Sequence, residues 1–428
     1  MQDLLAKWFK IYKDEVGLFF WSTLVFFLIH VADVLFNNFS ETAFLKRYGV
    51  EYLPMVYMVN SVLTFFIMAI VTAVTSAMSG GRFLGYLLIF CGVSVGAMRL
   101  LIPLGFELIY PVLFVMKTQY EVLLGLVFWD LANDLFNTRQ SKRIFPLITA
   151  GGVLGGMVGS FGTPWLAKVI SLDNLMWAYL VVSGLGAIIV KVMGRRFPAI
   201  LITEKRTKKK GKRSFLDEFK KVGPLIRESQ LLRILVLITL LPNVVIPIIN
   251  YQFNFVVDET FATEGKLIAF FAYFRGVMNI ISLVILLFVG KIYGKWGLPV
   301  ALMFHPANYL IAFGAILLRF DIFSAIYARI TTTVLRTTIN NPARAVLVGL
   351  IPAMYRSLVR PFLRGTVVRI GTLAGSGLVM LSGHWVHPRY LSVVAGLFVT
   401  VWILSSIHLK RTYSKILLDL ISVVAVYL

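Results

Sequence analysis

Long apolar stretches alternate along the chain with short polar connections. A run of about 20 mostly apolar residues crosses the hydrocarbon core of a bilayer as a helix. The pattern predicts twelve transmembrane helices, at 17–45, 54–77, 83–104, 110–137, 144–169, 176–194, 231–257, 264–289, 298–318, 322–350, 361–382 and 388–408. We therefore expect an all-α integral membrane protein.

The charges of the connections predict how these helices are oriented. Connections on one side of the membrane carry 26 Lys and Arg residues, whereas the connections and adjoining helix ends on the other side carry 5. Cytoplasmic loops carry an excess of Lys and Arg. We therefore expect a multi-pass protein of the cytoplasmic (inner) membrane with both termini in the cytoplasm.

One long basic connection divides the chain into two blocks of six helices. Its lysines are attracted to anionic lipid, so we expect it to contact lipid and not nucleic acid. The protein is expected to be a monomer. The predicted regions are an interfacial N-terminal helix (1–15), an N-terminal six-helix half (16–194), a basic cytoplasmic linker (195–230), a C-terminal six-helix half (231–408) and a basic-apolar cytoplasmic tail (409–428).

The two halves share a repeat with a spacing of 216 residues. GGVLGGMVGS in the first half matches VVRIGTLAGS in the second, and each follows a basic cytoplasmic turn. Small residues four apart let helices approach closely in lipid. The glycines expected to pack in this way are Gly151, Gly155, Gly159, Gly371 and Gly375. Two pseudo-symmetric halves arranged in parallel resemble the major facilitator superfamily, whose substrate sites lie near the middle of the membrane between the halves.

Composition agrees with a membrane protein and excludes several classes of site. Hydrophobic residues make up 58% of the chain and charged residues 14%, with a mean hydropathy of +0.83. The one cysteine, Cys91, excludes an intrachain disulfide. The chain has no phosphate-binding GxxxxGK[ST] or zinc-binding HExxH motif. Its one G-x-S-x-G match, GVSVG (92–96), lies inside a predicted span and not in the strand-to-helix turn that a serine nucleophile requires. We expect no enzyme activity, no cofactor and no metal.

Several arginines interrupt the apolar stretches of the second half. A guanidinium at the centre of a bilayer costs roughly 2.5–3.5 kcal/mol, so it must face water, a ligand or an acid. Arg275, Arg336 and Arg369 lie deepest, and we expect them to bind an anionic small-molecule substrate. Arg329 and Arg364 lie nearer the helix ends, where pairing or extension toward the membrane surface is expected.

Carboxylates concentrate instead in the first half. Asp33, Asn37 and Glu41 share one helical face, which cannot point at lipid. Two interpretations remain open for the acids: ion pairs between helices, for example Glu121 with Lys117 or Arg99, or proton coupling. Residues assigned to ion pairing or proton coupling are Asp33, Glu41, Glu121, Lys117 and Arg99, and asparagines assigned to the substrate site are Asn37, Asn38 and Asn254.

The segment FWDLANDLFNTRQSKRIFPLITAGGVLGGMVGS (128–160) resembles the ATP/ADP translocase family of nucleotide transporters. The resemblance rests on Trp129 and Asn133, the basic turn, Phe145-Pro146 and the glycine-rich helix. Nucleotide carriers of that family have basic residues in the first helix, where this chain reads NNFSET (37–42). Because no lysine is present there, ATP is one candidate substrate among several organic phosphates.

We therefore expect a secondary transporter that moves a phosphate-type organic anion, such as a nucleotide, by alternating access. Two alternatives remain: a lipid or lysophospholipid transporter of the same fold, and a membrane sensor that transports nothing. Exchange, proton symport and uniport are equally compatible with the sequence, because the spacing of residues does not reveal which charges pair.

Overall fold

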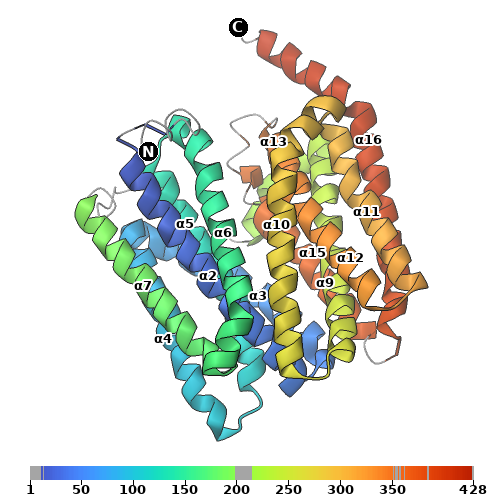
Figure 1. The fold of residues 1–428 in the computed structure, drawn as a ribbon. Helices are drawn as coiled ribbons and strands as arrows, with labels where there is room; N and C mark the ends of the chain where they lie inside the picture. Colours follow the sequence, from blue (N-terminus) through green and yellow to red (C-terminus); the bar gives the residue numbers. More distant parts are fainter. Residues whose placement is uncertain are drawn as a thin grey trace. The chain divides into compact units, whose positions relative to one another are not determined.

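In the computed structural model of the chain, every regular element of the described part is helical (Figure 1). The structure describes residues 11, 12, 14–197, 215–349, 351, 355, 358–360, 362–382 and 385–426. Elements before the linker are α2 (Val16–Arg47), η1 (Val50–Tyr52), α3 (Leu53–Ala77), α4 (Gly80–Leu101), η2 (Ile102–Leu104), α5 (Ile109–Leu135), α6 (Thr138–Ile170) and α7 (Leu175–Arg196).

The elements that follow residues 198–214 begin with an amphipathic helix, which precedes the second set of long helices. They are α8 (Phe215–Glu228), α9 (Gln230–Thr260), α10 (Glu264–Trp296), α11 (Leu298–Leu318), α12 (Ile322–Leu335), η4 (Arg336–Asn340), α13 (Asn341–Gly349), η5 (Phe362–Val367), α15 (Val368–Ser382), η6 (Pro388–Tyr390) and α16 (Leu391–Val426).

Eleven helical segments among the described residues are long and apolar enough to cross a membrane. The predicted span 322–350 is not one of them. Its described part is divided into α12, the π-helix η4 and α13, and it carries Arg329, Arg336 and Arg344. This divided segment, together with the eleven, occupies the twelve predicted spans. The all-α membrane fold is therefore confirmed, and the span at 322–350 is an interrupted helix.

Contacts between helices group the chain into two compact units. Unit 1 comprises Met1–Val50, Leu63–Thr207 and Phe261–Leu283. Within it, α2 packs against α5, α6 and α7. Ile268 of α10 belongs to the same buried apolar cluster as the residues of α2. The first turns of α10, which follow the linker in sequence, are thus part of unit 1.

Unit 2 comprises Glu51–Val62, Lys208–Thr260 and Val284–Leu428. Among its described membrane-length helices, α9 is the most enclosed, because 67% of its most apolar stretch is buried. Helix α9 packs against α12, α15 and α16. Within the described residues, α9 has the role in unit 2 that α2 has in unit 1.

The repeated glycines lie where two helix backbones almost touch. A Cβ atom on Gly155 of α6 would lie 2.2 Å from the carbonyl oxygen of Phe27 in α2. A Cβ atom on Gly375 of α15 would lie 2.0 Å from the carbonyl oxygen of Val244 in α9. Gly151, Gly159 and Gly371 are similarly crowded. Only a hydrogen atom fits at these positions, so α6 packs closely on α2 and α15 packs closely on α9.

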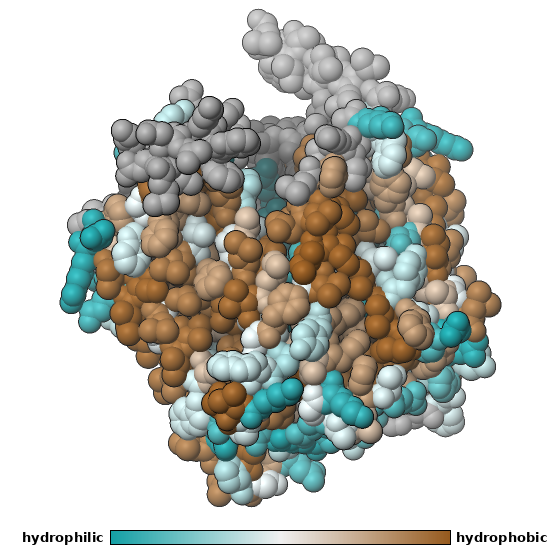
Figure 2. Space-filling model, in the orientation of Figure 1, coloured by the Kyte–Doolittle hydropathy of each residue, from teal (hydrophilic) through white to brown (hydrophobic). Residues whose placement is uncertain are grey.

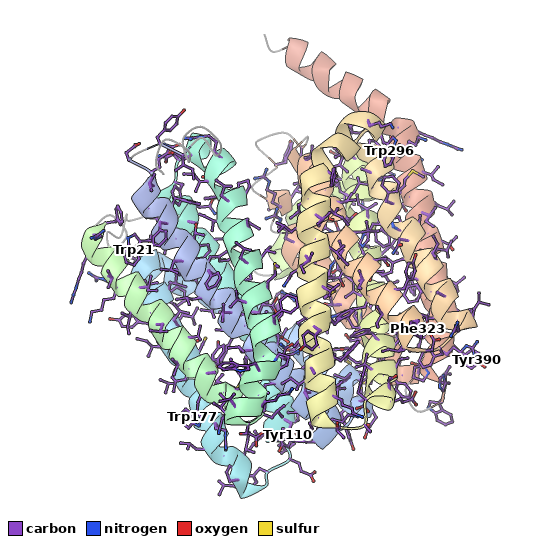
Figure 3. All side chains as sticks on the ribbon, in the orientation of Figure 1. Trp21, Tyr110, Trp177, Trp296, Phe323 and Tyr390 are labelled. Carbon is purple, nitrogen blue, oxygen red and sulfur yellow. The ribbon has the colours of Figure 1, made fainter. Side chains whose placement is uncertain are left out.

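Apolar side chains cover the outer flanks of the helices, and hydrophilic ones gather toward helix ends (Figure 2). Leu381 and Leu397 are 77% and 67% exposed, an arrangement that requires lipid around the protein. In unit 2, Phe323 and Tyr390 lie at one end of the helices and Trp296 at the other (Figure 3). Aromatic rings at the two ends are typical of the boundaries between membrane and water.

Three predicted regions lie partly outside the described residues. In the interfacial helix 1–15, only residues 11, 12, 14 and 15 are described. In the linker 195–230, residues 198–214 are not described, and the part that follows forms α8. In the tail 409–428, helix α16 continues from the last span to Val426. The predicted division into five regions stays a prediction.

Candidate functional site

A buried charge cluster lies in unit 1 around the carboxylate of Glu41. Lys117 of α5 donates to one carboxylate oxygen, with an Nζ–Oε1 distance of 2.5 Å. Arg275 of α10 donates to the other oxygen through Nη2. The side chains of Glu41, Lys117 and Arg275 are only 14%, 5% and 18% exposed. One carboxylate therefore serves two cations in a poorly solvated place.

Asn38 holds the guanidinium of Arg275 from a second direction. Arg275 donates through Nη1 to the side-chain oxygen of Asn38. The amide nitrogen of Asn38 donates in turn to Thr163 Oγ1 at 3.0 Å, and Thr163 donates to the carbonyl oxygen of Gly159 at 2.6 Å. The close packing of α6 on α2 thus positions a hydrogen-bonded chain that ends at Arg275.

Aromatic rings lie beside both cations of the cluster. Nζ of Lys117 lies 4.1 Å from the ring centroid of Phe114, and Cζ of Arg275 lies 5.3 Å from that of Phe271. Ring faces attract cations without neutralising them. With two cations and one carboxylate, the group formed by Glu41, Lys117 and Arg275 has one excess positive charge. Glu121 also lies within electrostatic range of Lys117 and places negative charge beside the group.

The other predicted acids lie close to the cluster along α2 and α5. Asp33, two turns before Glu41, lies within electrostatic range of Glu121. Within the described part of the chain, neither of them forms an ion pair. Asn37 is half-buried on the same stretch of α2.

The sequence-based pairing of Glu121 with Lys117 or Arg99 is not found. Lys117 turns toward Glu41, and Nε of Arg99 donates to the side chain of Asn174 at 3.0 Å. The reason is the packing of α2 against α5, which brings Glu41 within reach of Lys117 from a position 76 residues away. Arg99 thus binds the residue that precedes α7 and is not part of the cluster around Glu41.

A second ion-pair network in unit 1 is absent from the sequence predictions. Arg47, at the end of α2, binds both carboxylate oxygens of Glu264 at 2.5 and 2.8 Å and Asp173 at 2.7 Å. The hydroxyl of Tyr110 accepts a further bond from Arg47 at 3.5 Å. The predicted topology gives a usable signal, because it puts Arg47 and Glu264 at helix ends on the same side of the membrane.

In unit 2, two of the predicted substrate arginines have no neutralising partner. Among the described residues, Arg336 and Arg369 form neither an ion pair nor a side-chain hydrogen bond. From 284 to 428 the sequence contains two acids, Asp321 and Asp419. Asp321 pairs with Arg319 at 2.6 Å. Both Arg336 and Arg369 are half-buried, so their charge is available for an anion.

The remaining predicted polar residues of unit 2 have structural contacts. The side chain of Asn254 is buried and donates to Tyr57 Oη at 3.1 Å. Cζ of Arg329 lies 5.5 Å from the ring centroid of Phe253. Unit 2 thus contains two predicted substrate arginines without an ion-pair partner among the described residues, Arg336 and Arg369. The guanidinium of Arg329 lies near an aromatic ring.

Comparison with known families and structures identifies relatives of this arrangement. The family model described as TLC ATP/ADP transporter matches residues 94–356, which is more than half of the chain. A comparison with curated protein sequences finds no match. The matched segment includes Lys117, Arg275 and Arg336.

Solved structures of transporters have the same fold as this chain. A mutant of the nucleoside transporter NupG matches with a TM-score of 0.67 at 12% identity, covering 91% of this chain and 98% of NupG. A bacterial homologue of the iron transporter ferroportin, in an inward-facing state, gives 0.66 at 12% identity, covering 92% and 98%. The xylose transporter XylE from E. coli gives 0.60 at 10% identity, covering 92% and 95%. Identities this low establish the fold alone, which is that of the major facilitator superfamily.

Proposed function

Because the chain belongs to the TLC ATP/ADP transporter family of membrane transporters, we propose that it moves a nucleotide or a related organic phosphate by alternating access. Membership in this family of transporters agrees with the prediction that the chain is not an enzyme. The proposal concerns the substrate class, the residues that bind it and the mode of coupling.

The observation that carries the proposal is the uncompensated charge of Arg336 and Arg369. A guanidinium in a membrane-length segment is costly unless it faces water, a ligand or an acid. No acid pairs with either residue in the described part of the chain. Phosphate suits such positions, because the planar fork of arginine donates two charge-assisted hydrogen bonds to it.

The cluster around Glu41 supports an anionic substrate in a second way. The first helix has no lysine in NNFSET (37–42), yet Lys117 and Arg275 from other helices reach Asn38 and Glu41 in that stretch. In this proposal the carboxylate of Glu41 binds both cations when no substrate is present, and the substrate phosphate replaces it. A phosphate group with up to two negative charges competes with the single charge of Glu41 for them.

This competition favours exchange of one anion for another. Lys117 and Arg275 are nearly excluded from solvent, so they require a negative partner in every state of the cycle. Bound phosphate or Glu41 can supply it, and an incoming anion replaces a departing one. Protonation of Asp33 or Glu121 would add proton coupling, and transport measured across a pH gradient separates the two modes.

The location and partners in this proposal follow from the distribution of charge. The excess of Lys and Arg on one side supports a cytoplasmic membrane location with both termini in the cytoplasm. The linker 195–230 would contact anionic lipids and not nucleic acid, with the protein acting as a monomer. Cofactors and metals have no place in this mechanism.

Uptake into proteoliposomes tests the proposal. Vesicles containing purified protein and preloaded with ADP, inorganic phosphate or no anion are supplied with labelled ATP, ADP or lysophospholipid. We expect uptake of a nucleotide that depends on the internal anion. Arg336→Gln and Arg369→Gln should each reduce it about tenfold or more, as expected for one lost charge-assisted contact.

The matched control is Arg233→Gln, because Arg233 is an exposed arginine of α9 in the same unit. This variant should transport like the wild type. Uptake of nucleotides no faster than in empty vesicles would refute the proposal. Uptake of lysophospholipid alone would instead support the lipid-transporting alternative.

A further inference from the structure

A small cationic cavity lies within unit 2, separate from the predicted substrate arginines. It has a volume of about 270 Å³. Its polar lining consists of Thr239 of α9, Asn341 and Arg344 of α13, Arg360 just before η5 and Arg364 within η5. Val348, Leu363 and Val368 complete its walls. Sequence reasoning did not single out Arg344 or Arg360.

Three guanidiniums in one cavity repel one another unless an anion lies between them. Arg344 lies within electrostatic range of both Arg364 and Arg336. Arg344 donates through Nη2 to Asn341 Oδ1 at 3.4 Å, and this uncharged amide oxygen does not neutralise the guanidinium. Within the described residues no carboxylate pairs with Arg344, Arg360 or Arg364. The cavity therefore concentrates positive charge that no described carboxylate pairs with.

The helices around the cavity depart from α-helical geometry at two places. The π-helix η4 (Arg336–Asn340) ends just before Asn341, and the π-helix η5 (Phe362–Val367) contains Arg364. Single π-turns within α-helices are rare and frequently occur at functional sites. Each π-turn contains an extra residue, which changes the direction of the side chains that follow. The two turns lie where the polar residues of α13 and η5 meet at the cavity.

We propose that this cavity binds a phosphate group, as a site additional to the transport site. Its volume of about 270 Å³ lies just below the roughly 300–1,000 Å³ of cavities that hold drug-sized ligands, so it suits a phosphate with a short attachment. Arginine forks fit the tetrahedral oxygens of phosphate. A phospholipid headgroup and free phosphate present the same chemistry, and the inference holds whether or not nucleotides are the transported cargo.

Titration of the purified full-length protein with inorganic phosphate tests the site. Binding is measured by calorimetry at constant ionic strength, with chloride replaced by phosphate. Arg360 and Arg364 are exposed, so the variant Arg360→Gln/Arg364→Gln should fold. We expect it to weaken phosphate binding at least tenfold, since one lost charge-assisted bond accounts for about that factor. Arg233→Gln, an exposed arginine outside the cavity, should bind like the wild type.

The two sources of phosphate are distinguished in nanodiscs. Native mass spectrometry of protein in discs of phosphatidylcholine with or without phosphatidic acid reports whether a lipid stays bound. A phosphatidic acid molecule that is lost in the double variant and displaced by inorganic phosphate identifies a lipid site. Phosphate binding without retained lipid identifies a free-anion site.

Equal phosphate affinity of the double variant and the wild type would overturn the inference. Phosphatidic acid that both proteins retain to the same extent would exclude this cavity as its binding site. Nucleotide uptake by the wild type is measured on the same preparations. If nucleotide uptake is observed but the double substitution leaves the phosphate affinity unchanged, the phosphate site in the cavity is refuted and the transport proposal stands. Absent uptake with arginine-dependent phosphate binding refutes transport of nucleotides and leaves the cavity intact.

Discussion

The guanidinium of Arg275 in α10 donates to the carboxylate of Glu41 in α2, 234 positions earlier in the chain. The same carboxylate accepts from Lys117 at 2.5 Å. Removing either cation leaves a one-to-one ion pair, whereas removing the carboxylate leaves two adjacent cations in a poorly solvated place. The contributions of these three side chains to stability are therefore unequal.

This inequality predicts that Glu41→Gln destabilises the protein more than Lys117→Gln or Arg275→Gln. An uncompensated buried charge costs about 3–5 kcal/mol, and Glu41→Gln leaves two such charges beside each other. Thermal unfolding in detergent without added anions measures the order of the three variants. A transported phosphate should raise the melting temperature of Glu41→Gln more than that of the wild type. Equal losses in all three variants would contradict a shared carboxylate.

A second prediction concerns the glycines of α6. Gly155→Ala should destabilise the protein by at least about 1–3 kcal/mol, because its Cβ atom would lie 2.2 Å from a backbone oxygen that cannot rotate away. Gly162→Ala on the same helix is the control, since nothing lies within 4 Å of its Cβ position. It should be neutral or slightly stabilising, because alanine favours helix. Similar melting temperatures for both variants would refute close α6–α2 contact at Gly155.

The fold could be predicted largely from the sequence, because hydropathy alone determines which segments enter a membrane. The repeat of Gly155 and Gly371 indicated two related halves, since close packing requires small residues at fixed spacing. The interruption of 322–350 by η4 could not be predicted, because a π-turn has no characteristic local sequence. The grouping of the first turns of α10 with unit 1 depends on long-range packing.

The candidate site could be predicted only as a set of residue types. The cost of a charge in lipid singled out Arg275, Arg336 and Glu41 without any knowledge of neighbours. Which charges pair depends on how helices pack, and Glu41 finds its partners 76 and 234 positions away. For the same reason, the cations that reach NNFSET (37–42) from other helices could not be found by comparing the first helix alone.

A third prediction follows from Glu15, which lies just before α2 and outside the membrane-spanning part. Burial alone raises the pKa of its carboxyl, but hydrogen bonds from the Tyr12 amide, Arg143 and Gln140 and the charge of Arg143 outweigh burial, so the pKa lies below its ordinary value. A lowered pKa gives stability that is present above the ordinary pKa of about 4.3 and is lost as pH falls through the lowered value.

Glu15→Gln should therefore destabilise the protein at pH 7 by about 1.5 kcal/mol, the contribution of a hydrogen bond to a charged group. The difference from the wild type should shrink below pH 4.3 and vanish once Glu15 is protonated. Thermal unfolding between pH 3 and pH 7 measures it. The control is Glu107→Gln, whose side chain is exposed and forms no ion pair in the described residues. A difference that stays constant with pH would exclude the Glu15–Arg143 pair as its source.

A fourth prediction tests the orientation in the membrane. The one native cysteine, Cys91, is buried, so an introduced cysteine should be the main target of a membrane-impermeant maleimide. Lys266 and Arg227 are both exposed, in α10 and α8. With a cytoplasmic linker, Lys266→Cys should react in intact cells and Arg227→Cys only after permeabilisation. The reverse pattern would invert the proposed topology.

A fifth prediction concerns how strongly Arg47 is coupled to each of its two acids. Its hydrogen bonds to Glu264 are bidentate, at 2.5 and 2.8 Å, whereas Asp173 forms an ion pair at 2.7 Å without a hydrogen bond. Parallel charge-assisted bonds are stronger than a single one, and partial exposure of all three side chains weakens both pairs.

Double-mutant cycles with Arg47→Gln, Glu264→Gln and Asp173→Asn should give about 1–2 kcal/mol for Arg47–Glu264 and about 0.5 kcal/mol for Arg47–Asp173. A larger coupling to Asp173 would mean that Arg47 mainly secures the start of α7. The expected order makes Arg47 the link between the end of α2 and the start of α10, the same two helices that Glu41 and Arg275 join farther along.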